Sequence, residues 1–186
     1  KNVARTLGKI FAEAEIEIIF GGGNVGLMGE LATSCIENNG KITGIIPQHL
    51  ERMEVSHKGL TNLHVVETMH IRKTMMFDLS QAIVVLPGGI GTLDEFFEVI
   101  TWKQLNLHNK PIVLINLNNF WEPLIFLLKH LKNSNFTNIN TKKWFDYISD
   151  LTYSFFKYSR NPVHNIKFKY YYHDYNNSRL IDLNNE

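Results

Sequence analysis

Short apolar runs alternate with segments of helical periodicity along the chain as far as Leu131. The apolar runs typical of strands are Ile16–Phe20, Ile42–Ile46, Leu63–Val66, Ala82–Leu86 and Ile112–Ile115. The segments with apolar residues at helical spacing are Val3–Phe11, Leu27–Ile36, Met69–Ser80, Leu93–Ile100 and Phe120–Leu131. Strands that alternate with helices indicate right-handed βαβ units. The pattern therefore predicts an α/β fold, a doubly wound parallel sheet with helices on both faces.

The character of the chain changes after Leu131. Residues 132–186 are rich in Asn, Lys and Tyr and lack clear periodicity. We therefore predict one domain over residues 1–131, followed by an atypical tail over residues 132–186. A basic aromatic run in this tail, Lys167–Tyr172, offers charge and stacking for RNA, but a single short run is weak evidence for it.

Charge and cysteine content narrow the range of partners. The formal net charge is +1, which predicts neither a nucleic acid nor a membrane as partner. Cys35 is the only cysteine, so no intramolecular disulfide forms, and the histidines lack metal-ligand spacing. No apolar run approaches the roughly 20 residues of a membrane-spanning helix. We expect a cytoplasmic protein without a metal or another cofactor.

Three glycines and a threonine follow the apolar run Ala82–Leu86, namely Gly88, Gly89, Gly91 and Thr92. Glycines after a buried strand let the backbone turn sharply and approach a ligand closely. The helix that follows presents free N–H groups and a partial positive charge. This combination predicts a phosphate-binding turn, although a tight strand-to-helix turn without a ligand would use some of the same residues.

Glu95 lies just beyond this turn and has two interpretations. The spacing Thr92-x-x-Glu95 matches a capping box, in which the carboxylate satisfies only the Thr92 backbone N–H. A carboxylate one helical turn from a bound phosphate can instead reach the sugar of a nucleotide. The spacing permits both roles.

A second glycine cluster, Gly21–Gly26, follows another predicted strand and satisfies G-x-G-x-x-G. A dinucleotide site would also need an acid after the next strand, and Ile46–Gln48 supplies none. NAD is therefore disfavoured, and we expect Gly22 and Gly23 to form part of a smaller nucleotide pocket. A simple packing turn is the alternative.

Arg72 stands in line with an apolar helical stripe formed by Met75, Met76 and Leu79. An arginine in that position must find a partner or reach a cleft. It either forms a buried ion pair or binds an anionic ligand with its planar fork. Lys73 either adds charge to the same site or is solvated.

These clusters, in this order, resemble the LOG ("Lonely guy") family of cytokinin riboside 5′-monophosphate phosphoribohydrolases, whose members are often labelled lysine decarboxylase-like. The resemblance covers roughly Val3 to Leu131 and includes Gly21–Gly29, Met69–Lys73 and Pro87–Glu95. The last segment matches the family motif P-G-G-x-G-T-x-x-E. It implies a Rossmann-like nucleotide-binding catalytic domain.

By the same resemblance, Arg72 and Glu95 take the catalytic positions, and Glu54 falls where the family has a substrate-contacting acid. The implied nucleotide-binding positions are Lys73, Gly88, Gly89, Gly91 and Thr92. The implied reaction hydrolyses the N-glycosidic bond of a purine or cytokinin nucleoside 5′-monophosphate, such as AMP, and releases the free base and ribose 5-phosphate. The resemblance also implies a homodimer.

The chain departs from the family at both ends. Family members begin with a strand that ends in a Cys-Gly-Ser-Ser-like turn, and we expect this central strand to be missing here, so that the domain is incomplete at its N-terminal side. Three functions therefore remain: a phosphoribohydrolase, a truncated non-catalytic nucleotide-binding relative, and a domain whose tail recruits a partner.

Overall fold

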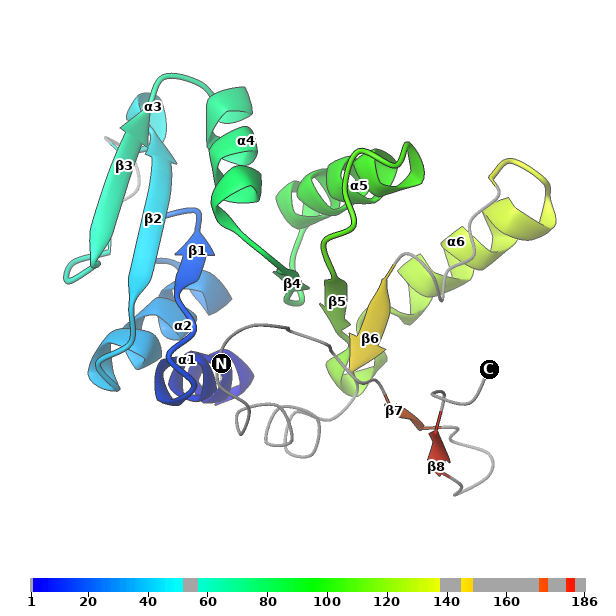
Figure 1. The fold of residues 1–186 in the computed structure, drawn as a ribbon, viewed down its shortest axis with the longest axis horizontal. Coiled ribbons are helices and arrows are strands. Elements are labelled where there is room, and N and C mark those ends of the chain that lie inside the picture. Colours follow the sequence, from blue (N-terminus) through cyan, green and yellow to red (C-terminus); the bar gives the residue numbers. More distant parts are fainter. Residues whose placement is uncertain (1, 52–56, 138–144, 149–170, 174–179, 183–186) are drawn as a thin grey trace.

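The computed structural model describes residues 2–51, 57–137, 145–148, 171–173 and 180–182, in which helices and strands alternate as the sequence predicts (Figure 1). The strands are β1 (Ile18–Phe20), β2 (Ile42–Pro47), β3 (Asn62–Val66), β4 (Ile83–Val85), β5 (Ile112–Ile115), β6 (Asp146–Ile148), β7 (Tyr171–His173) and β8 (Leu180–Asp182). The helices are α1 (Asn2–Glu13), α2 (Gly26–Glu37), α3 (Gln48–Glu51), α4 (Met69–Leu79), α5 (Ile90–Gln104) and α6 (Glu122–Asn133), with a 3₁₀ turn, η1, at Leu117–Asn119.

In the described part of the chain, parallel strands form two three-stranded sheets. The order is β1-β2-β3 in the first sheet and β4-β5-β6 in the second, and every pairing in both sheets is parallel. In Figure 1 the first sheet lies on one side of the molecule and the second continues beyond β4 on the other. Parallel strands joined through helices confirm the predicted α/β class.

The alternating side chains of β5 show that helices cover both faces of its sheet. Val113 and Ile115 pack in a core with α1 and α2. Ile112 and Leu114 point the other way, into a core with α5 and α6. All four side chains are buried, as expected for a strand covered on both faces.

The inner edges of the two sheets are β1 and β4. Among the described residues, no strand pairs with the second edge of either one, so the parallel sheet is divided in two. The sequence predicts a strand at Ala82–Leu86 that is buried on both faces, yet Ile83 and Val84 are only half-buried. The reason is that β4 has a neighbour on one edge alone within the described part of the chain.

Two segments differ from the simple sequence picture. The polar stretch after β2 contains the short helix α3. Beyond the boundary predicted at Leu131, β6 pairs with β5 and so extends the sheet.

The run Lys167–Tyr172 lies outside the described residues, except for Tyr171 and Tyr172 at the start of β7. In the described segments, no helix has the length and apolar character needed to cross a membrane.

Candidate active site

One cavity of about 240 Å³ is lined by residues that follow β4 and β5 and by the first turns of α1 and α2. The lining residues are Val3, Leu27, Pro87, Leu117, Asn118 and Phe120. Each glycine cluster follows the carboxyl end of a strand, the edge at which doubly wound proteins bind ligands.

The predicted phosphate turn opens a helix in the expected way. Gly89 is the N-cap residue of α5 and, being glycine, has no side chain to cap the helix by a hydrogen bond. A Cβ added at Gly89 or at Gly91 would meet nothing within 4 Å, so the space beside this backbone is open. A Cβ at Gly88 would instead overlap the Thr92 hydroxyl, which packs against the turn. The first N–H groups of α5 are thus left accessible to an anion.

The start of α5 decides between the two interpretations of Glu95. A capping box would require Thr92 to be the N-cap residue. The helix instead begins at Ile90, and the Leu93 N–H already donates to the Gly89 carbonyl at 3.1 Å. The capping interpretation is therefore wrong, because Thr92 is already inside the helix and Glu95 lies in its second turn. Glu95 is left without a structural task at the helix terminus.

Arg72 lies in the first turn of α4, a helix whose N-cap residue Thr68 accepts a hydrogen bond from the Ile71 N–H at 3.2 Å. The guanidinium lies against Gly21, where a Cβ would overlap Nη2. Arg72 Nη1 donates to Met69 Sδ at 3.7 Å, and the buried Nε lacks a hydrogen-bond partner among the described residues. No ion pair holds this arginine within the described part of the chain. Its fork is available for a ligand.

Glu95 and Arg72 act on one another electrostatically. Burial raises the pKa of Glu95, and the positive charge of Arg72 is the strongest influence that lowers it. Among the weaker influences, Asp94 and Glu98 raise the pKa of Glu95, whereas Lys73 lowers it. The net result is a raised pKa, which is typical of a carboxyl group that serves as an acid or a base in a cleft.

Lys73 points toward α5. Its Nζ lies 3.1 Å from Asp94 Oδ2 and 3.1 Å from Glu98 Oε2. Burial would lower the pKa of Lys73, but the hydrogen bonds to Glu98 and Asp94 outweigh it, and the pKa is raised. The ammonium group is therefore engaged with two carboxylates.

The Gly22–Gly23 segment is buried and joins the polar loop after β2. Gly22 has a φ of +78°, which favours glycine, and its carbonyl accepts the His57 N–H at 3.1 Å. His57 Nε2 also lies 2.9 Å from Thr33 Oγ1. The predicted substrate contact Glu54 lies outside the described residues.

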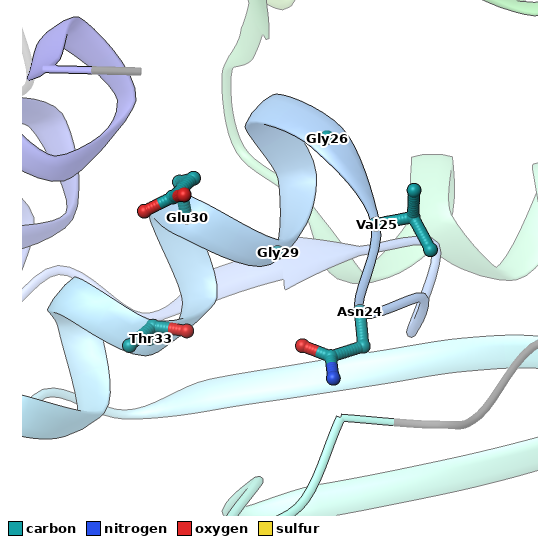
Figure 2. Close-up of a pocket in the computed structure, with 6 residues that line it drawn as sticks. All are labelled: Asn24, Val25, Gly26, Gly29, Glu30 and Thr33. Carbon is teal, nitrogen blue, oxygen red and sulfur yellow. The ribbon is translucent and has the colours of Figure 1, made fainter.

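A larger cavity of about 430 Å³ borders the start of α2 (Figure 2). It is lined by Asn24, Val25, Gly26, Gly29, Glu30 and Thr33. Figure 2 shows that these side chains come from one face of α2 and from the loop before it. Neither this cavity nor the smaller one is lined by Arg72 or Glu95.

Sequence reasoning missed two features of this region. Gly21 provides the surface on which Arg72 rests, and the only signal was its place at the head of the glycine run. Asp94 and Glu98 hold Lys73, although their i, i+4 spacing on one helix face was visible.

Replacing Gly21 with alanine is expected to displace the Arg72 guanidinium, because the new methyl group would overlap it. A misplacement of about 1 Å at a reacting centre lowers rate by about 10²-fold. We expect turnover of a nucleoside monophosphate to fall by about that factor while the melting temperature stays close to that of the unmodified protein. In an Arg72→Met background the alanine should add little; a fully additive loss would contradict this account.

Comparisons with known proteins point to one family. A family model described as possible lysine decarboxylase matches residues 28–153, more than half of the chain. A cytokinin riboside 5′-monophosphate phosphoribohydrolase of Rhodococcoides fascians is 43% identical over 76% of this chain and 72% of its own length. A probable enzyme of the same name from Oryza sativa subsp. japonica is 39% identical over 68% of this chain. The chain covers 56% of that rice relative.

Solved structures show the same fold at low sequence identity. The molybdenum cofactor carrier protein of Chlamydomonas reinhardtii superimposes with a TM-score of 0.55 and 19% identity, over 79% of this chain and 78% of its own. The molybdenum cofactor binding protein of Rippkaea orientalis gives a TM-score of 0.54 and 22% identity, over 78% of each chain. At such identities the likeness concerns the fold alone.

Proposed function

The chain belongs to the LOG family, and we propose that it hydrolyses the N-glycosidic bond of a purine or cytokinin nucleoside 5′-monophosphate. The products would be the free base and ribose 5-phosphate. The similar proteins of Rhodococcoides fascians and rice carry the name of such an activity.

One observation carries the proposal: an arginine without an ion-pair partner in the described residues acts on a carboxyl group of raised pKa, beside an open glycine turn at a helix start. Phosphate suits the turn, because the N–H groups of α5 and its dipole favour an anion. The sugar would then lie within one or two helical turns of Glu95.

The chemistry follows from these groups. The bond between C1′ of the ribose and the base nitrogen breaks, its electron pair leaves with the base, and an oxocarbenium-like sugar develops. Ionised Glu95 stabilises that charge and orients water, whose oxygen bonds to C1′ while its proton passes to the carboxylate. Arg72 holds an anionic or hydroxyl group of the substrate, or assists departure of the base. The departing base takes up a proton from solvent, and Glu95 returns its proton to solvent, so that one water is consumed in each turnover.

The remaining predicted residues would bind rather than react. Gly88, Gly89, Gly91 and Thr92 would hold the 5′-phosphate, and the segment at Gly22 and Gly23 would close the pocket on another side, with Glu54 as a further contact. Binding energy from the phosphate would position the reacting bond, which raises rate without any chemistry at the phosphate itself.

The decarboxylase description would call for pyridoxal phosphate, and the described lysines do not fit that cofactor. A Schiff-base lysine needs a lowered pKa beside the phosphate site. Lys73 is ion-paired, and its pKa is raised. Burial lowers the pKa of Lys110. This lysine, however, donates a hydrogen bond to the carbonyl of Phe77, near the carboxyl end of α4, whereas Arg72 lies in the first turn of that helix, so Lys110 lies at the opposite end of α4 from Arg72. These positions support hydrolysis without that cofactor.

The turn predicts a preference for the monophosphate. We expect kcat/KM for AMP or a cytokinin ribotide to exceed that for the matching nucleoside by about 10²-fold or more, since a charge-assisted phosphate contact is lost with the nucleoside. Chromatographic measurement of the free base released over time gives kcat/KM for the monophosphate and for the nucleoside. Equal values would contradict the assigned phosphate site. Thermal stabilisation by AMP without turnover would instead support the non-catalytic relative.

We further propose a cytoplasmic homodimer, as the family resemblance implies. Exposed apolar side chains beside the site support an interface there: Ile71 on α4 is 42% exposed and Ile90 at the start of α5 is 82% exposed.

A further inference from the structure

Two methionine sulfurs lie beside the Arg72 guanidinium. Arg72 Nη1 donates to Met69 Sδ at 3.7 Å. A Cβ added at Gly21 would overlap Arg72 Nη2 and would lie 3.3 Å from Met28 Sδ, so a second sulfur is close to the fork. Among the described residues, Met69 Sδ is the one acceptor of a hydrogen bond from the Arg72 side chain, and the buried Nε has none. A thioether accepts hydrogen bonds only weakly, so this fork is held loosely.

We propose that Met69 is an oxidation site, at which a peroxide forms a sulfoxide that holds the Arg72 guanidinium and so inactivates the enzyme. A lone pair of Met69 Sδ attacks hydrogen peroxide, an S–O bond forms and the O–O bond breaks. The second oxygen leaves as water with both peroxide protons, so the sulfur is oxidised and the peroxide reduced by two electrons. The effect on turnover rests on the function proposed above.

Helix geometry brings Met69 and Arg72 together. Side chains three residues apart in a helix lie on one face, and both residues belong to the start of α4. Helical side chains lean toward the N-terminus, so Arg72 leans over Met69 and away from Met75, which lies three residues in the other direction. The hydrogen bond to Met69 agrees with this direction, and within the described part of the chain none joins Arg72 to Met75.

The Met69 sulfur is within reach of a small oxidant. Met69 is half-buried, and its neighbours Thr68 and His70 are exposed. The guanidinium of Arg72 has five N–H donors and no acceptor, so a polar sulfoxide oxygen suits it better than a thioether does. The rotatable bonds of methionine let that oxygen turn toward Nη1 or Nη2. The oxidised side chain therefore competes with a phosphate or hydroxyl group of the substrate for the same donors.

The test treats the full chain with hydrogen peroxide and measures three quantities. Peptide mass spectrometry gives the sulfoxide at each methionine, release of free base gives kcat/KM for AMP, and phenylglyoxal, a dicarbonyl that reacts with free guanidinium groups, gives the reactivity of Arg72. With Met69 fully oxidised, we expect kcat/KM to fall about tenfold or more and the phenylglyoxal reaction at Arg72 to slow about threefold or more, as a charge-assisted hydrogen bond would cause. Methionine sulfoxide reductases should restore both values.

Three leucine variants assign the effect, and each is compared with its own untreated sample. Met69→Leu should keep its turnover and its Arg72 reactivity through peroxide treatment. Met75→Leu is the matched control on the same helix and should lose both, as the natural sequence does. Protection by Met28→Leu or Met75→Leu in place of Met69→Leu would overturn the inference, as would unchanged reactivity of Arg72 in protein that is fully oxidised at Met69.

The time course in the natural sequence keeps the test decisive if Met69→Leu fails to fold. Loss of Arg72 reactivity should follow the appearance of sulfoxide at Met69, and a loss that follows sulfoxide at Met28 instead would contradict the inference. Absence of AMP hydrolysis in the untreated protein would refute the proposed function. The phenylglyoxal reaction needs no turnover, so it would still decide whether the sulfoxide holds Arg72, and the two failures are distinguishable.

Discussion

Glu95→Gln is expected to lower kcat for nucleoside monophosphate hydrolysis by about 10³-fold or more, because glutamine neither accepts the water proton nor carries the charge that stabilises the sugar cation. The amide matches the carboxyl in shape, so binding should persist. Free base released from AMP measures kcat, and the shift of melting temperature with AMP measures binding. Substantial residual turnover would show that another group acts on the sugar.

Folding stability provides the control for this variant. An unfolded glutamate titrates near its ordinary value, whereas burial raises the pKa of Glu95 in the folded protein. At pH values between the unfolded and the folded pKa, the folded state binds more protons at Glu95 than the unfolded state, so the contribution of Glu95 to stability falls as pH rises. Above the folded pKa the ionised carboxylate is fully destabilising, and glutamine removes that cost. The melting temperature of Glu95→Gln at neutral pH should therefore equal or exceed that of the unmodified protein.

The raised pKa of Glu95 also sets the pH dependence of activity. Catalysis needs ionised Glu95, so the acidic limb of the kcat profile should lie above the ordinary pKa of a glutamate. Glu13→Gln, on the exposed face of α1, is the matched substitution and should leave both activity and the acidic limb unchanged. A drop in stability in Glu95→Gln with normal turnover would return Glu95 to a structural role.

The sequence predicted the alternation of strands and helices well, because periodicity is a local property that burial enforces. β5 has its predicted bounds, and α2 extends the predicted segment Leu27–Ile36 by one residue at each end. The start of α5 was harder to predict. Thr92 is a favourable N-cap residue and Glu95 completes the box, yet the helix extends back to Ile90, and the backbone of Gly89 serves as the cap without a side chain. Local spacing does not distinguish a threonine at the cap from one inside the first turn.

The site itself depends on contacts between segments far apart in the chain. Arg72 meets Gly21 because α4 packs beside β1, and Lys73 reaches Glu98 across the space between α4 and α5. Residue types and spacing singled out Arg72 and Glu95 but left a structural alternative open for each, and their catalytic roles stay predictions. The carboxylate partners of Lys73 were not predictable in this way, because a solvated lysine, a phosphate ligand and an ion-paired lysine share one sequence pattern.

Arg72→Met is expected to lower kcat/KM by about 10²–10³-fold, the effect typical of losing one preorganised group that stabilises transition-state charge. Methionine keeps the unbranched stem and its packing against Met69. The folded protein loses a buried Nε that has no partner among the described residues, so stability should hold or rise. A structural ion-pair arginine would behave in the opposite way, since its removal would leave a buried carboxylate unpaired and lower the melting temperature.

Arg5→Met is the matched control for Arg72→Met. Arg5 pairs with Glu37 and, at 3.5 Å, with Glu30 across α1 and α2, and its side chain is 40% exposed. Losing such pairs typically costs at most about 1 kcal/mol, and turnover should not change. The double variant Arg72→Met/Glu95→Gln then tests whether the two groups act on one step. If they do, the combined loss falls well short of the product of the single losses. Independent, multiplying losses would separate Arg72 from the reacting centre and leave it a role in binding alone.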